Sequence, residues 1–135
     1  MNATILFHAG LLAYAASAGF FLAHLVQATP RRERVARLAL LAGFLLHGGA
    51  VGIRMAGLAG GAAFRLDEAL SYVAFLVAGA WLLLDRWHRI PTIGAFVTPL
   101  IVATLLPAHA VPGAAAGPGR ASLGPLLPLH VAVSI

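Results

Sequence analysis

The sequence contains no cysteine. Without thiols the chain forms no disulfide, holds no zinc or iron–sulfur cluster through thiolates, and attaches no haem covalently. Charge is also scarce, because 10% of the 135 residues are charged, against about a quarter in an ordinary soluble protein. Hydrophobic residues make up 61% of the chain, and the mean hydropathy is +0.93. A lipid bilayer is therefore the expected solvent.

Lysine is absent as well, so all nine basic residues are arginine, against four acidic residues. A net charge of +5 raises the possibility of a nucleic-acid partner. The arginines, however, cluster at the ends of apolar runs, where basic residues set membrane topology. We therefore expect no nucleic-acid partner. The first residues lack a basic segment and the first apolar run is long, which predicts a retained span and not a cleaved signal peptide.

The apolar residues form five runs. They cover residues 5–26, 38–58, 69–84, 92–106 and 125–135. The first four approach the length that crosses a hydrocarbon core of about 30 Å, and the fifth has about half of it. The sequence thus predicts an all-α fold, a single polytopic transmembrane helix bundle over residues 1–135 with four full spans and a truncated fifth. Pro99 is a candidate kink in the fourth span.

Arginine is unevenly divided between the two ends of the predicted spans. Residues 27–37 hold four arginines and one acid, and residues 85–89 hold two arginines and one acid. At the opposite ends Arg65 is followed by two acids, and Arg120 stands alone. The positive-inside rule then places the segments 27–37 and 85–89 in the cytoplasm as loops, and the N-terminus outside. The expected location is the bacterial inner membrane.

Six histidines are many for so apolar a chain, and four lie within or at the edge of apolar runs. These four are His8, His24, His47 and His130. Polar groups at such depth are costly and often functional, and neutral imidazole is a common axial ligand of haem iron. His47 stands in mid-span before Gly48 and Gly49, which leave room for a flat ligand or a neighbouring helix.

Arg54 follows His47 by two helical turns and shares its face. Its guanidinium suits a carboxylate such as a haem propionate. The alternative is that His47 bonds a neighbouring helix while Arg54 extends to the lipid headgroups, and spacing alone favours this alternative. His130 lies near the predicted outer surface and suits either a cofactor ligand or an interfacial histidine. No phosphate loop, nucleophile–base pair or metalloprotease motif supports an enzyme.

Four motifs follow one another over residues 44–135. They are GFLLHGGAVGIR, RLDEALSYVAFLVAGAWLLLDR, RIPTIGAFVTPLIVATLL and LGPLLPLHVAVSI. In this order they resemble the cytochrome c assembly protein family, which includes CcsA and ResC and the related HemX and YpjD proteins. The resemblance implies a bundle of about eight spans that handles or delivers haem for cytochrome c maturation.

The resemblance also implies that haem is held at the outer face between two histidines beneath a tryptophan-rich loop. His130 matches one of these ligands, whereas the loop and the second outer histidine have no counterpart in the chain. The chain therefore looks like the N-terminal half of such a protein, with a C-terminal half or other assembly proteins as expected partners. The alternative is a non-haem scaffold or regulator of the HemX and YpjD kind with structural histidines. A small transporter is a third class, for which Pro99 is the one hint.

Overall fold

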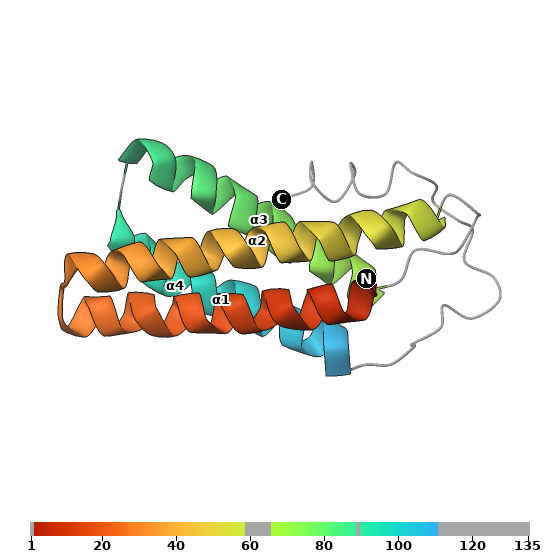
Figure 1. Ribbon diagram of the computed structural model, residues 1–135, viewed down its shortest axis with the longest axis horizontal. Helices are drawn as coiled ribbons and strands as arrows, with labels where there is room; N and C mark the ends of the chain where they lie inside the picture. The colour runs from red at the N-terminus through yellow and green to blue at the C-terminus, as the bar shows by residue number, and fades with distance from the viewer. Residues whose placement is uncertain (1, 59–65, 89, 111–135) are drawn as a thin grey trace.

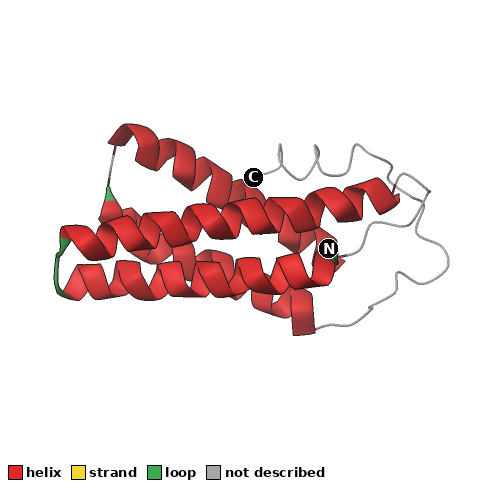
Figure 2. Cartoon of the chain, viewed as in Figure 1, coloured by secondary structure: helices red, strands yellow, loops and turns green. Residues whose placement is uncertain are grey.

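A computed structural model describes residues 2–58, 66–88 and 90–110, and all regular structure in these ranges is helical (Figure 2). The helices are α1 (Ala3–Val26), α2 (Pro30–Leu58), α3 (Leu66–His88) and α4 (Pro91–Ala110). The predicted all-α class is confirmed. Each of the first four predicted apolar runs falls inside one of these helices.

Three of the helices are long and apolar enough to cross a membrane. By length and composition these stretches are Ala3–Val26, Pro30–Ala56 and Asp67–His88. The apolar part of α4 is shorter and covers Pro91–Pro107. The predicted fifth run, residues 125–135, lies outside the described residues. The structure thus supports a membrane protein with three helices of spanning length.

The arginine-rich segment 31–37, predicted to be a loop, is helical and forms the first two turns of α2. Proline is favoured at the first position of a helix, so Pro30 starts α2, and Glu33 in the first turn complements the helix dipole. Arginine and glutamate are good helix formers, and long arginine side chains reach headgroups from a helix end. The predicted polar turn at 85–89 likewise continues α3 as far as His88. Pro91 begins α4, again at the helix position that favours proline.

The helices form a bundle in which α1 lies antiparallel beside α2 and also packs against α4 (Figure 1). Helix α3 packs mainly against α4 and makes a smaller contact with α2. Figure 1 shows α3 crossing α2 and separating from it toward the short turn between α1 and α2. This end carries Arg31, Arg32, Arg34, Arg37 and Arg86, and is called the arginine-rich end below.

Small residues bring the helices close together. A Cβ atom on Gly94 of α4 would lie 2.8 Å from the ring of Phe21 on α1, so the absent side chain makes room for the aromatic ring. The Ser17 hydroxyl donates a hydrogen bond of 2.8 Å to the Ala36 carbonyl, which joins α1 to α2.

Large apolar side chains such as Leu12 and Phe96 remain more than two-thirds exposed. Such a surface suits contact with lipid.

Candidate functional site around a buried histidine

His47 on α2 is the most deeply buried histidine of the described residues, with 1% of its surface exposed. Its Nε2 atom lies 2.8 Å from the Ser71 hydroxyl on α3. Its Nδ1 atom lies 3.5 Å from the Tyr14 hydroxyl on α1. A neutral imidazole offers one donor and one acceptor, and a hydroxyl serves as either. The imidazole therefore connects three helices through polar contacts on both of its nitrogens.

Aromatic rings fill the space around this imidazole. Phe7, Tyr14 and Phe75 each present their rings nearly perpendicular to it, with centroids 5.8 to 5.9 Å away. Phe75 in turn stacks on Phe44 at 4.5 Å. Such edge-to-face and stacked contacts are favourable beyond simple burial. His47 is thus enclosed in an aromatic cage whose rings belong to α1 and α3, with Phe44 of α2 packed behind Phe75.

The glycines around His47 allow this cage to close. A Cβ atom on Gly43 would lie 2.8 Å from the Tyr14 ring, and one on Gly48 would lie 3.0 Å from the Phe75 ring. A Cβ atom on Gly49 would lie 3.4 Å from the Leu6 side chain. The room that the sequence predicted beside the imidazole is therefore taken by side chains of neighbouring helices.

Arg54 lies on the same face of α2, two turns beyond His47, as the spacing predicted. Its guanidinium carbon is 5.2 Å from the centre of the Phe7 ring, which is a cation–π distance. Arg54 also lines a cavity of about 10 Å³ together with Val51, Glu68, Ser71 and Tyr72, a volume that suits a single water molecule. Among the described residues Arg54 has no ion pair.

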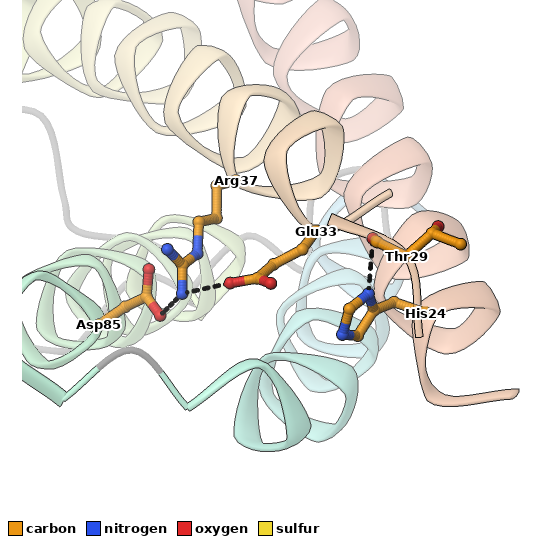
Figure 3. Close-up of polar contacts among 5 residues, drawn as sticks. All are labelled: His24, Thr29, Glu33, Arg37 and Asp85. Carbon is orange, nitrogen blue, oxygen red and sulfur yellow. Dashed lines mark hydrogen bonds and ion pairs between the residues drawn. The ribbon is translucent and has the colours of Figure 1, made fainter. Parts of the chain in front are cut away.

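The other predicted histidines occupy local roles or lie outside the described residues. The Nδ1 atom of His8 is 2.7 Å from the Thr4 carbonyl, one turn earlier in α1. The Nδ1 atom of His24 is 3.0 Å from the Thr29 carbonyl and closes the turn between α1 and α2 (Figure 3). His130 falls in the part of the chain that the structure does not describe. His47 and Arg54 are therefore the predicted site residues that the structure places.

Two polar clusters were not predicted from the sequence. One is the pairing of Tyr14 and Ser71 with His47. The sequence feature that could have indicated it is the presence of hydroxyl groups within apolar helices. The other is an ion-pair network in which Arg37 Nη2 lies 3.0 Å from Asp85 Oδ1 and 2.9 Å from Glu33 Oε1 (Figure 3). This network joins α2 to α3 at the arginine-rich end. The sequence feature that could have indicated it is the presence of both arginines and acids in two segments assigned to the same membrane side.

Comparison with protein-family models, with curated proteins and with solved structures finds no match to this chain.

Proposed function

We propose that this protein is a membrane component of haem handling or delivery for cytochrome c maturation. The observation that carries the proposal is the order of the four motifs over residues 44–135. The proposal includes α4 as a fourth span and residues 125–135 as the start of a fifth. It places the arginine-rich end in the cytoplasm of a bacterial cell and the N-terminus outside the inner membrane.

The surroundings of His47 do not fit haem iron in the described arrangement. An axial ligand needs a free imidazole nitrogen and flat space beside the ring. Both nitrogens of His47 have hydroxyl neighbours, and three aromatic rings enclose it. Arg54 fits the group better, because its guanidinium has no ion pair among the described residues and suits a propionate carboxylate. The proposal therefore assigns ligation of the haem iron to His130. His47 has the structural role of fixing the helix that carries Arg54.

The test measures haem bound to the purified gene product, together with any downstream segment that the gene encodes. His130→Ala should weaken or remove the Soret band, because it removes the proposed iron ligand. His88→Ala is the matched control, since His88 is an exposed histidine at the end of α3, and it should retain haem. Unchanged haem in a folded His130→Ala variant would reject His130 as the iron ligand.

The second candidate is a non-haem membrane scaffold or regulator, and the closed cage around His47 favours it. In this case His8, His24 and His47 have structural roles, which their hydrogen bonds support. The same experiment separates the two candidates. A scaffold predicts no haem in the wild-type protein, whereas His47→Ala should still lower its thermal stability.

A further inference from the structure

Two adjoining hollows open at the arginine-rich end of the bundle. The first has a volume of about 480 Å³ and is lined by Pro30, Glu33, Arg34, Arg37 and Leu38. The second has a volume of about 340 Å³ and is lined by Arg37, Leu38, Leu41, Leu82, Asp85 and Arg86. They share Arg37 and Leu38 as lining residues, and the two together are called the α2–α3 groove below. Its lining residues belong to the first part of α2 and the last part of α3, and Figure 1 shows these two parts diverging.

The part of the groove nearer the middle of the bundle is apolar. It is lined by Leu38 and Leu41 on α2 and by Leu82 on α3. Leu38 and Leu41 are 59% and 43% exposed, so neighbouring helices of the described chain leave them uncovered. Both belong to the stretch of α2 that has the length and composition of a membrane span. At this depth the natural occupant is a hydrocarbon chain.

The mouth of the groove carries a surplus of positive charge. The two acids, Glu33 and Asp85, are both held by Arg37 at 2.9 and 3.0 Å. Arg34 on α2 and Arg86 on α3 are exposed, and neither has an ion pair among the described residues. Among the described residues, two guanidinium groups without an ion pair therefore stand on the two helices that carry the groove residues. Guanidinium groups bind phosphate oxygens well, often through two hydrogen bonds.

We propose that the α2–α3 groove binds one anionic phospholipid. The phosphate lies at Arg34 and Arg86, and one acyl chain covers Leu38, Leu41 and Leu82. Basic pockets between transmembrane helices are known to hold anionic headgroups. The ion pair between Arg37 and Asp85 forms the floor of the site and keeps the two helices at a fixed spacing. This inference goes beyond the haem proposal and does not depend on it.

Native mass spectrometry of the detergent-purified full chain tests the proposal. The protein is titrated with phosphatidylglycerol and, in parallel, with phosphatidylcholine. The wild type should retain one phosphatidylglycerol more tightly than phosphatidylcholine. Arg34→Gln and Arg86→Gln should each weaken that retention about fivefold, the factor that corresponds to about 1 kcal/mol per basic residue. Arg31→Gln is the matched control, because Arg31 is exposed at the same end but does not line the groove.

A second variant tests the acyl-chain part of the site without changing charge. Leu41→Trp should fill the groove and exclude the lipid. Leu12→Trp is its control, since Leu12 is 71% exposed on α1 and lies away from the groove. Both leucines face outward, so both variants should fold, which their gel-filtration profiles and helical circular dichroism check.

Several results would overturn the proposal. They are equal retention of the two lipids by the wild type, equal weakening by Arg31→Gln, or unchanged binding in Leu41→Trp. A photoreactive residue in place of Leu41 reports the occupant directly in native membranes. Cross-linking to lipid supports the site, whereas cross-linking to another segment of the chain or to a second copy contradicts it.

Discussion

At the scale of single residues, the structure shows how a polar imidazole is accommodated deep among apolar helices. His47 is satisfied by hydroxyls from two other helices, and its remaining contacts are aromatic edges. A buried polar atom that loses its partner costs about 1–3 kcal/mol. Each hydroxyl in the cage therefore stabilises the bundle mainly by preventing that loss.

Ser71→Ala tests this energetic role. The substitution leaves one nitrogen of His47 without its 2.8 Å partner, so the free energy of unfolding should fall by about 1–3 kcal/mol. Thr104→Ala is a matched control, because the Thr104 hydroxyl bonds only to the Leu100 carbonyl of its own helix. The measurement is equilibrium unfolding in mixed micelles. Equal stability of Ser71→Ala and Thr104→Ala would show that the bond to His47 contributes nothing.

Gly43 and Gly52 offer a second comparison within one helix. A Cβ atom on Gly43 would approach the Tyr14 ring to 2.8 Å, whereas one on Gly52 meets nothing within 4 Å. Gly43→Ala should destabilise the bundle by about 1–3 kcal/mol through overpacking. Gly52→Ala should be neutral or stabilising by up to about 1 kcal/mol, because alanine is the better helix former. Stabilisation by both substitutions would contradict the close packing of α1 against α2.

At the scale of helices, the contact between α2 and α3 has two polar anchors. The bond from His47 to Ser71 lies deep in the bundle, and the bond from Arg37 to Asp85 lies at the arginine-rich end. Between them Phe44 stacks on Phe75, and a Cβ atom on Gly79 would meet Phe44 at 3.1 Å. Since α3 otherwise packs mainly against α4, these few contacts set its position relative to α2.

A double-mutant cycle measures the anchor at the arginine-rich end. Arg37→Gln removes the guanidinium that pairs with the Asp85 carboxylate, whose side chain is 10% exposed, whereas Asp85→Asn leaves Arg37 its ion pair with Glu33. We expect a coupling free energy on the order of 1 kcal/mol, because solvent reaches the pair only in part. The double variant should then lose less free energy of unfolding than the sum of the losses in the two single variants. Purely additive effects would mean that the pair does not hold α3 to α2.

At the scale of the whole molecule, hydropathy predicted the helices well and their contacts poorly. The first four predicted apolar runs lie inside α1 to α4, because each of them is bounded by charge, proline or small residues. The segment 31–37 was wrongly predicted to be a loop, since charge marks the edge of the hydrocarbon layer and not the end of a helix. The partners Ser71 and Tyr14 were not predictable, because a hydroxyl in an apolar run carries no information on which helix it faces.

The orientation of the whole bundle is directly testable, because the sequence contains no cysteine that would compete with an introduced one. Ala28 in the turn between α1 and α2, and Ile90 between α3 and α4, are both exposed at the arginine-rich end. Asn2 precedes α1 and is exposed at the opposite end. A single cysteine at each position provides a unique thiol for a membrane-impermeant maleimide.

The arginine excess at one end predicts which thiols react in intact cells. Asn2→Cys should be labelled from outside, whereas Ala28→Cys and Ile90→Cys should be labelled only after the membrane is permeabilised. Two features of the bundle make the three positions informative together. Helices α1 and α2 are antiparallel, and α3 returns the chain to the arginine-rich end, where α4 begins (Figure 1). External labelling of both Ala28→Cys and Ile90→Cys would show that the orientation is the opposite of the predicted one. Labelling of these two positions from opposite sides would show that α2 and α3 do not both cross the bilayer.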